Sequence, residues 1–165
     1  MKKNILITGG AGFIGSCFTI QAIAQGHRVV VLDKLSYAGN KDNLKSIFSH
    51  PDFLFFQGDI CDQKRVGELL NQFQIDWLVN FAAESHVDNS ISGPAIFMET
   101  NIVGTYHLLW AALSYWKENN KSEHFRFLHV STDEVYGELD LDSTTKFNED
   151  TPYAPNSPYS ASKAS

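Results

Sequence analysis

A glycine-rich turn near the N-terminus constrains the fold of this chain more than any other feature of its sequence. TGGAGFIG, residues 8–15, follows a short apolar run and precedes a segment whose apolar residues have helical spacing. Glycines permit a sharp turn, close approach of the backbone to a phosphate and tight packing of helix on strand. The helix N-terminus then offers N–H donors to the anion. The sequence therefore predicts a strand, a phosphate-binding turn and a helix, in this order.

Short apolar or β-branched runs alternate with helix-compatible segments along most of the chain. The predicted strands are Asn4–Ile7, Arg28–Leu32, Phe53–Gln57, Trp77–Asn80 and Arg126–Val130. The predicted helices are Phe13–Gln25, Gln63–Phe73 and Ala95–Trp116. Such alternation requires right-handed crossovers between parallel strands. We therefore predict an α/β fold, a doubly wound parallel sheet of the Rossmann type.

Composition narrows the class of protein. The chain has 165 residues, of which 43% are hydrophobic, enough for one domain. Its 13 Lys and Arg against 19 Asp and Glu give a net charge of -6, which offers nucleic acid no electrostatic footprint. No segment has the pattern of a membrane span or a signal peptide, and Cys17 and Cys61 lie outside any C-x-x-C spacing. We expect a cytoplasmic protein that binds neither nucleic acid nor membrane.

Acidic residues follow the second and third predicted strands. Asp33 lies where a carboxylate can accept hydrogen bonds from both ribose hydroxyls of an adenosine and repel a 2′-phosphate, which favours NAD over NADP. The basic side chain of Lys34 next to it weakens this argument against NADP. Asp59 is predicted either to contact the adenine or to cap the helix that begins near Gln63. The alternative for the whole region is a glycine-rich turn that binds no ligand.

The end of the chain changes character. Glu138–Asn148 is polar, and Thr151–Pro158 holds three of the five prolines. We predict a long, ordered loop here. A helix is predicted to begin at Tyr159, but the chain ends at Ser165. We expect residues 1–165 to form an incomplete NAD-binding domain whose C-terminal, substrate-binding part is absent.

Two groups of reactive side chains lie in this last part of the chain. Tyr159 and Lys163 are four residues apart, so both lie on one face of the predicted helix. An ammonium beside a tyrosine stabilises the phenolate and makes it a usable general base. Asp133 and Glu134 follow Thr132 at the end of the fifth predicted strand. Adjacent acids there either supply proton chemistry, or one of them caps a helix.

Six segments, in order, resemble a known family. They are TGGAGFIG, DKLSYAGN, GDICD, FAAESHVD, TDEVYG and SPYSASKAS. Together they resemble the extended short-chain dehydrogenases/reductases and, within that family, the dTDP-glucose 4,6-dehydratases. The resemblance covers the whole chain. TDEVYG discriminates most, because the related UDP-glucose 4-epimerases lack the Asp-Glu pair and need neither C5 proton removal nor water loss.

The resemblance implies a reaction and a role for each catalytic residue. Tyr159 would take the C4 hydroxyl proton of dTDP-glucose while hydride passes to NAD+. Glu134 would then remove the C5 proton, and Asp133 would protonate the departing C6 hydroxyl. The same hydride would return to C6 to give dTDP-4-keto-6-deoxyglucose. One departure is Asn89, where the family leads us to expect arginine.

The motifs and the resemblance together give the predicted site residues. The catalytic residues are Thr132, Asp133, Glu134, Tyr159 and Lys163. The cofactor-binding residues are Gly9, Gly12, Phe13, Ile14, Gly15, Asp33, Lys34, Leu35, Ser36, Asp59, Ile60, Phe81, Ala82, Ala83, Glu84, Ser85, Thr100, Tyr159 and Lys163. The residues that face the substrate are Ser85, Thr132, Asp133 and Glu134.

The resemblance also implies partners. These are a nucleotide-sugar substrate and, in the full-length protein, a second copy of the chain, with helix Ala95–Trp116 and the Tyr159 helix at the dimer interface. No metal is expected, since His86 and His129 lack ligand neighbours at a motif spacing and are predicted to be structural. The alternatives are another NAD-dependent nucleotide-sugar dehydratase or epimerase, or a catalytically silent NAD-binding module. The 165-residue chain alone is expected to be inactive.

Overall fold

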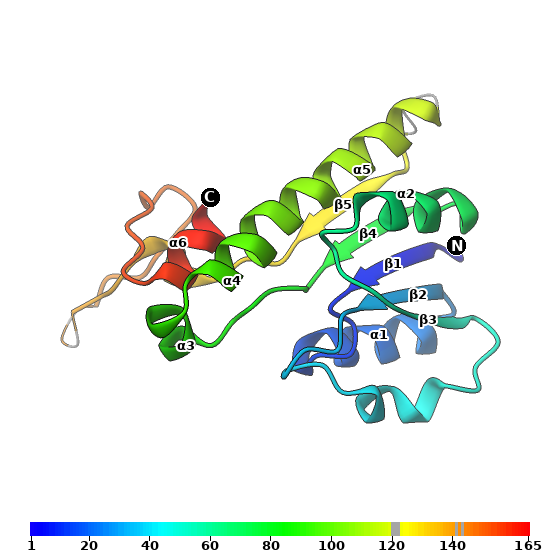
Figure 1. Cartoon of the computed structure of the whole chain (residues 1–165), viewed down its shortest axis with the longest axis horizontal. Helices are drawn as coiled ribbons and strands as arrows, with labels where there is room; N and C mark the ends of the chain where they lie inside the picture. The colour runs from blue at the N-terminus through cyan, green and yellow to red at the C-terminus, as the bar shows by residue number, and fades with distance from the viewer. Residues whose placement is uncertain (120–122, 141, 143) are drawn as a thin grey trace. The chain divides into compact units, whose positions relative to one another are not determined.

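The structure, a computed structural model, describes residues 1–119, 123–140, 142 and 144–165 and divides the chain into two compact units (Figure 1). The first unit comprises Met1–Ala82 and Gly104–Val130, and the second comprises Ala83–Val103 and Ser131–Ser165. The predicted polar loop Glu138–Asn148 lies in the second unit, and its residues 141 and 143 are outside the described residues.

A five-stranded parallel sheet with strand order β3-β2-β1-β4-β5 forms the centre of the first unit. The strands are β1 Asn4–Thr8, β2 Arg28–Asp33, β3 Phe53–Gln57, β4 Trp77–Asn80 and β5 Arg126–His129. Each predicted strand is confirmed to within one residue at its ends. The strand order places β1 between β2 and β4, as right-handed crossovers on both faces require. The predicted α/β fold with a doubly wound parallel sheet is confirmed.

Helices cover both faces of this sheet. They are α1 Phe13–Ala24, the 3-10 helix η1 Lys41–Ile47, α2 Gln63–Gln72 and α5 Thr105–Glu118. Successive side chains of a strand point to opposite faces, so Ile5 and Ile7 join one apolar cluster with residues of α1 and η1. Leu6 joins the other cluster, with residues of α2 and α5. Buried on both faces, the strands are nearly continuous apolar runs, as parallel strands usually are.

The second unit is built of short helices. They are α3 Val87–Ser92, α4 Ala95–Phe97, the π-helix η2 Met98–Gly104, whose last residue belongs to the first unit, the 3-10 helix η3 Asp133–Tyr136 and α6 Pro158–Ala164. Helix α6 packs against α3, α4 and η3. The predicted helix Ala95–Trp116 is helical throughout, but its π-helical segment was not predicted. None of the helices that the structure describes is long and apolar enough to cross a membrane.

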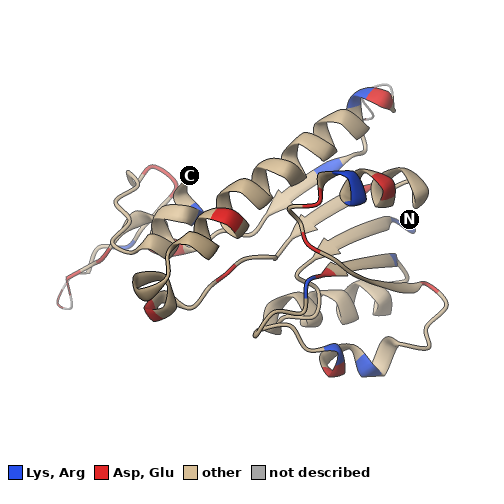
Figure 2. Ribbon diagram, viewed as in Figure 1, with Lys and Arg blue, Asp and Glu red and all other residues tan. Residues whose placement is uncertain are grey.

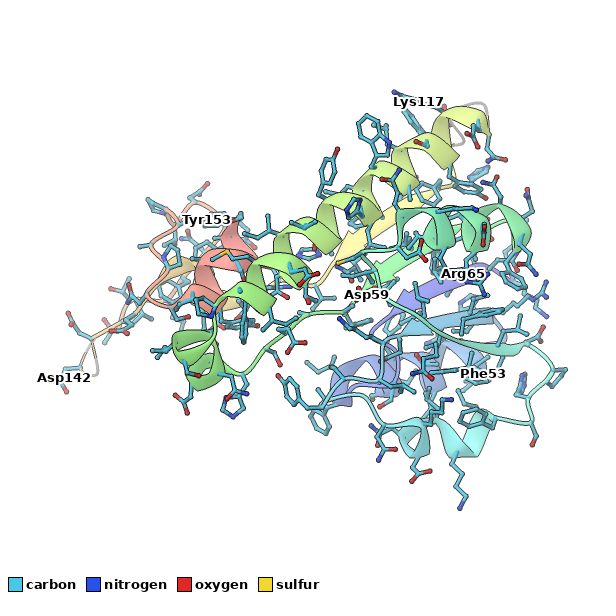
Figure 3. All side chains as sticks on the ribbon, in the orientation of Figure 1. Phe53, Asp59, Arg65, Lys117, Asp142 and Tyr153 are labelled. Atoms are coloured by element: carbon cyan, nitrogen blue, oxygen red, sulfur yellow. The ribbon has the colours of Figure 1, made fainter. Side chains whose placement is uncertain are left out.

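Edge strand β3 is strongly apolar and is flanked by cations. Lys41 of η1 lies over the Phe55 ring at 4.9 Å, and Arg65 of α2 lies over Phe56 at 5.0 Å. Figure 3 labels Arg65 and Phe53, the first residue of β3. Figure 2 shows basic and acidic residues together on η1 and α2. Charged side chains beside an edge strand oppose its pairing with another chain, so these contacts protect the free edge of β3.

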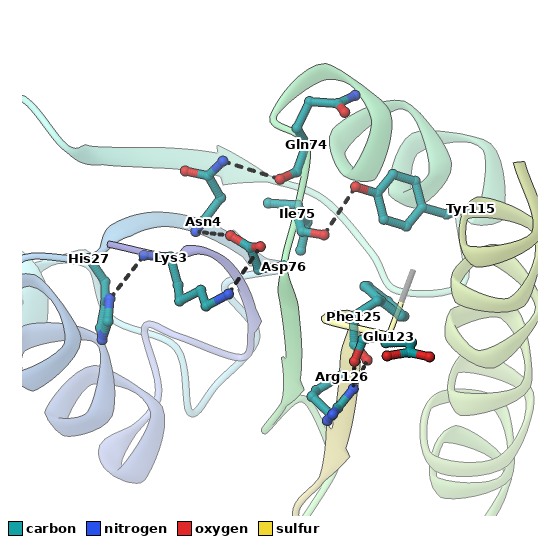
Figure 4. Close-up of polar contacts among 10 residues, drawn as sticks. All are labelled: Lys3, Asn4, His27, Gln74, Ile75, Asp76, Tyr115, Glu123, Phe125 and Arg126. Atoms are coloured by element: carbon teal, nitrogen blue, oxygen red, sulfur yellow. Dashed lines mark hydrogen bonds and ion pairs between the residues drawn. The ribbon is translucent and has the colours of Figure 1, made fainter. Parts of the chain in front are cut away.

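Side-chain hydrogen bonds join the amino ends of β1 and β4 to helix α5 (Figure 4). The backbone N–H of Asn4 donates to the Asp76 carboxylate at 2.8 Å, and the Tyr115 hydroxyl donates to the Ile75 carbonyl at 3.0 Å. Burial, with the nearby Asp76 carboxylate, raises the pKa of Tyr115. Tyr115 therefore remains a neutral hydrogen-bond donor that holds α5 against the sheet.

The carboxyl ends of β1, β4 and β5 meet at one buried side chain. Asn80, which is fully buried, accepts hydrogen bonds at Oδ1 from the Thr8 hydroxyl and from the Ala82 amide, at 2.5 and 3.1 Å. Its Nδ2 lies 3.0 Å from Nδ1 of His129. This contact agrees with the predicted structural role of His129. Asn80 thus connects the ends of three strands.

Replacing Asn80 with leucine should destabilise the protein strongly. Asn80→Leu keeps the side-chain size but leaves the Thr8 hydroxyl and the Ala82 N–H without their acceptor in the interior. We expect the free energy of unfolding to fall by about 3 kcal/mol, measured by urea denaturation.

Thr8→Val is the matched control, because it removes one hydroxyl but keeps Asn80 and its bond to Ala82. Its cost should be about 1 kcal/mol. An Asn80→Leu protein as stable as the wild type would show that Asn80 does not hold these strand ends.

Candidate functional site

The glycine-rich turn between β1 and α1 is built on close backbone contacts. Gly9 has φ +69°, and a Cβ there would lie 2.6 Å from the amide nitrogen of Ala82. A Cβ at Gly15 would collide with the carbonyl oxygen of Gly9. Gly12 has more room, since its Cβ would lie 3.3 Å from that oxygen. The turn therefore requires glycine at 9 and 15 for its own packing, before any ligand is considered.

The first turn of α1 is open to a ligand. Gly12 is the N-cap and contributes no side-chain hydrogen bond to the first N–H groups of the helix. Phe13 and Ile14, at the start of α1, are 92% and 62% exposed although both are large and apolar. Uncapped N–H groups and the helix dipole suit an anion, and exposed apolar side chains beside them suit a flat organic group.

Asp33 ties the glycine-rich turn to the loop after β2. Its Oδ2 accepts a hydrogen bond from the Ala11 amide and its Oδ1 one from the Leu35 amide, both at 2.8 Å. Leu35 has φ +59°, a left-handed conformation that is unfavourable for leucine. Each carboxylate oxygen keeps a second lone pair. Asp33 is therefore a structural residue that can still accept hydrogen bonds from a ligand.

Asp59 forms an ion pair with Lys34, with Nζ and Oδ2 2.7 Å apart. Its other oxygen, Oδ1, accepts a hydrogen bond from the Cys61 amide at 2.9 Å. Burial by itself raises the pKa of Asp59, but the Cys61 N–H and the Lys34 ammonium outweigh it, so the pKa lies below its usual value. The alternative prediction, that Asp59 caps α2, is wrong. Asp62 is the N-cap of α2, and its side chain accepts a hydrogen bond from the backbone N–H of Arg65.

The other predicted cofactor residues of the first unit also follow strand ends. Ser36 lies in the loop after β2, and Ile60, which is buried, follows β3. Phe81 and Ala82 follow β4, where the Phe81 ring packs on Phe18 at 5.3 Å. The first unit thus brings together the glycine-rich turn after β1 and the residues after β2, β3 and β4 at the carboxyl edge of the sheet, the usual ligand position in open α/β folds.

In the second unit, the two predicted acids lie on the turn η3. The Thr132 hydroxyl caps this turn by accepting a hydrogen bond from the Glu134 amide at 3.3 Å. Asp133 and Glu134 are exposed. Because Thr132 occupies the cap position, neither carboxylate is needed to begin a helix here.

Backbone contacts at the C-terminal end fix the turn η3 in place. Gly137 has φ +97°, and a Cβ there would lie 2.6 Å from the carbonyl oxygen of Ala154. The Ala154 amide donates to the carbonyl of Val135 at 3.0 Å. These contacts hold the proline-containing segment against η3, so the two carboxylates project from a fixed backbone.

Helix α6 carries the Tyr-Lys pair. It begins with a capping box between Ser157 and Ser160, and Pro158 occupies its first turn. Tyr159 is 9% exposed, and its ring packs edge-on against Phe97 at 6.4 Å. Burial lowers the pKa of Lys163 from 10.5 to about 8. Lys163 is therefore still an ammonium at neutral pH.

Asn101 is a functional candidate that the sequence analysis did not identify. It is 5% exposed, its Oδ1 accepts from the Glu84 amide at 2.8 Å, and its Nδ2 donates to the Glu84 carbonyl and the Ser162 hydroxyl, each at 2.9 Å. Ser162 in turn donates to the Tyr159 carbonyl at 2.6 Å. Because Glu99 and Thr100 directly precede it, no pattern in the sequence distinguishes Asn101 from its polar neighbours.

The remaining predicted residues of the second unit lie between β4 and α5 in the sequence. Glu84 and Thr100 are buried, and Ser85 and His86 are exposed. Among the residues that the structure describes, no group of three or more His, Cys, Asp or Glu side chains is arranged to hold a metal ion. The second unit places exposed carboxylates on a turn that packs against the Tyr-Lys helix, and groups of these types are able to transfer protons.

The burial of Lys163 should make the free energy of unfolding depend on pH. The unfolded chain has a lysine pKa near 10.5 and the folded chain one of about 8. Between these pH values the unfolded state binds more protons, so the free energy of unfolding should rise with pH through this window. Lys163→Met should lose this rise, measured by urea denaturation in steps between about pH 7 and about pH 10.

Lys117→Met, at an exposed lysine of α5, is the control and should keep the wild-type pH dependence. Identical slopes for the wild type and Lys163→Met would mean that Lys163 is not desolvated.

Sequence comparison identifies close relatives. The chain is 57% identical over 161 residues to a dTDP-glucose 4,6-dehydratase of Xanthomonas campestris, covering 96% of this chain and 45% of the relative. It is 50% identical over 172 residues to dTDP-glucose 4,6-dehydratase 1 of Escherichia coli, covering 98% of this chain and 48% of the relative. The predicted resemblance is confirmed. The chain spans about half the length of the curated relatives it matches.

Solved structures of dTDP-glucose 4,6-dehydratases and UDP-glucose 4-epimerases are also similar to this chain. The dTDP-glucose 4,6-dehydratase DesIV of Streptomyces venezuelae, solved with NAD bound, has a TM-score of 0.87 at 45% identity, covering 98% of this chain and 48% of the other. A UDP-glucose 4-epimerase of Thermus thermophilus in complex with NAD has a TM-score of 0.82 at 32% identity, covering 98% and 47%. The family model described as GDP-mannose 4,6 dehydratase matches residues 6–165. Because this match covers almost the whole chain, the chain belongs to the GDP-mannose 4,6 dehydratase family.

Proposed function

We propose that the whole protein is an NAD-dependent dTDP-glucose 4,6-dehydratase. The observation that carries the proposal is the exposed pair Asp133 and Glu134 on η3, which packs against the helix that bears Tyr159 and Lys163. Relatives that are 50–57% identical to this chain carry the same name. In this proposal, residues 1–165 form the NAD-binding domain, and the substrate-binding part corresponds to the portion of the relatives beyond the match.

The first unit fits NAD as the cofactor. The turn at Gly9 and Gly15 leaves no space for side chains, and α1 begins without a side-chain cap, which suits a pyrophosphate. Asp33 keeps lone pairs for ribose hydroxyls. Related structures were solved with NAD bound. When bound, the cofactor would supply a hydride acceptor for the sugar C4 as NAD+ and a hydride donor for C6 as NADH.

The residues of the second unit would move the protons. Tyr159 removes the C4 hydroxyl proton during oxidation, and the Lys163 ammonium stabilises the phenolate. The resulting C4 ketone makes the C5 hydrogen acidic. Glu134 removes this hydrogen while Asp133 donates a proton to the C6 hydroxyl, which leaves as water. Returning hydride at C6 and a proton at C5 complete a 4-keto-6-deoxy sugar, so the cofactor is regenerated.

An epimerase is the second candidate, favoured by the similar backbone of the Thermus thermophilus enzyme. Epimerisation at C4 needs the Tyr-Lys pair but no base for C5 and no acid for C6. The Asp-Glu pair therefore supports the dehydratase. A silent NAD-binding module would have no use for either pair.

Glu134→Gln in the whole protein tests the dehydratase directly. The substitution removes the C5 base and leaves Tyr159, Lys163 and the cofactor turn in place. Product formation and exchange of the C5 hydrogen with solvent deuterium should both fall by about a hundredfold or more. Oxidation at C4 should persist, so enzyme-bound NADH should accumulate and be visible in absorbance.

Asp133→Asn is the matched comparison, because it removes the proton donor and keeps the base. Exchange at C5 should then continue while loss of water slows. Wild-type exchange and turnover in Glu134→Gln would exclude Glu134 as the base and remove the main support for a dehydratase.

We also propose that the whole protein is a homodimer. Helix α5 exposes several large apolar side chains at helical spacing: Tyr106, Leu109, Trp110 and Leu113, which are 55%, 49%, 49% and 40% exposed. They form one stripe, because residues three and four apart share a helix face. An apolar stripe of this kind supports a contact with a second copy of the chain.

Leu109→Asp should separate the subunits of the whole protein. A carboxylate buried in an apolar contact is costly, so the dimer dissociation constant should rise by about a hundredfold or more, measured by sedimentation equilibrium. Asn71→Asp, at an exposed position of α2, adds the same charge and should leave the dimer intact. A wild-type protein that is monomeric at micromolar concentration would contradict the proposal.

A further inference from the structure

Lys34 and Asp59 are brought together by the register of two neighbouring strands. In the parallel pair β2 and β3, Asp33 lies opposite Gln57, and the Gly58 amide donates to the Asp33 carbonyl at 3.0 Å. The residues directly after these strand ends are therefore neighbours. Lys34 Nζ and Asp59 Oδ2 are 2.7 Å apart, with side chains 50% and 31% exposed.

The Asp59 carboxylate has a fixed orientation. The Cys61 amide donates to its Oδ1 at 2.9 Å, so Oδ2 is directed to the lysine. Lys34 is thus held by an anchored acid. Figure 3 labels Asp59 in the chain segment that follows β3.

The charges at this edge of the sheet bear on which dinucleotide can bind. Asp33 is the residue expected to accept from the ribose hydroxyls, and its charge repels a 2′-phosphate. Lys34 is its neighbour in sequence, and a basic side chain at such a place accommodates the 2′-phosphate of NADP. The sequence therefore places an NAD-selecting residue and an NADP-accepting residue side by side.

We infer that Asp59 sets the preference for NAD over NADP by holding Lys34 in an ion pair, so that the ammonium is not available to a 2′-phosphate. The inference rests on the proposed NAD site. In this arrangement the 2′ position of the ribose faces the uncompensated charge of Asp33, while the charges of Lys34 and Asp59 cancel. Asp59 is a specificity-determining residue in this arrangement even without a contact of its own with the dinucleotide.

A double-mutant cycle that removes the charges of Asp59 and Lys34 tests this inference. The dissociation constants for NAD+ and NADP+ are measured by calorimetry at low salt for the whole protein and for Asp59→Asn, Lys34→Gln and the double variant. Asparagine at 59 can still accept from the Cys61 amide, so the local turn is kept. The readout is the ratio of NADP+ affinity to NAD+ affinity, because a loss of adenine contacts changes both affinities alike.

The expected order of this ratio follows from the charges. Asp59→Asn releases Lys34 and should raise the ratio by about tenfold or more, and high salt should reduce this gain. Lys34→Gln leaves two acids and should lower the ratio. The double variant restores one uncompensated acid and should return close to the wild-type ratio.

Asp52→Asn is the matched control. Asp52 also forms a lysine ion pair, at 2.6 Å with Lys2, and its loss changes the net charge equally. Its ratio should stay at the wild-type value. An unchanged ratio in Asp59→Asn, or a raised ratio that persists in the double variant, would overturn the inference while NAD binding stands. A wild-type protein that binds neither dinucleotide would instead overturn the proposed cofactor site and the inference with it.

Discussion

The buried amide of Asn80 is the interaction on which the layout of this protein depends. It holds the end of β1 through Thr8 and the end of β5 through His129, and it fixes the backbone just after β4 through the Ala82 amide. The glycine-rich turn begins directly after Thr8, and the chain enters the second unit directly after β4 and β5. The glycine-rich turn and both connections into the second unit therefore start from strand ends that are fixed by a satisfied, buried polar group.

Asp33 would combine a structural role with the proposed binding role in one side chain. Its two oxygens hold the Ala11 and Leu35 amides, and the second contact accompanies the left-handed backbone of Leu35. An acid at this position is required by the local backbone even without a cofactor. A change at Asp33 would therefore alter the backbone of the turn and the proposed ribose site at the same time. The Lys34 and Asp59 pair is a cleaner place to separate specificity from folding.

Local patterns predicted most of this fold, because a parallel strand buried on both faces and a glycine-rich turn are encoded by consecutive residues. Asn4–Ile7 and the helix from Phe13 are examples, and both match the structure closely. Features made by distant residues were not predictable. The bond between Asn101 and Ser162 spans 61 positions, and the pair of Lys34 and Asp59 depends on strand register. The π-helical turn η2 has no consecutive-residue signature of its own.

Burial affects the Tyr-Lys pair in two opposing ways. Desolvation lowers the pKa of Lys163 to about 8, so its ammonium loses a proton at a lower pH than an exposed lysine does. The same low-dielectric surroundings strengthen the attraction between that ammonium and a phenolate one helical turn away. A fully exposed lysine would keep its charge more firmly but would stabilise the phenolate less. A pKa that remains above neutral pH, in a half-buried site, keeps the charge and the strong interaction together. In the proposed reaction, the two carboxylates on η3, outside this pair, would decide whether the C4 ketone is reduced again, as in an epimerase, or eliminates water.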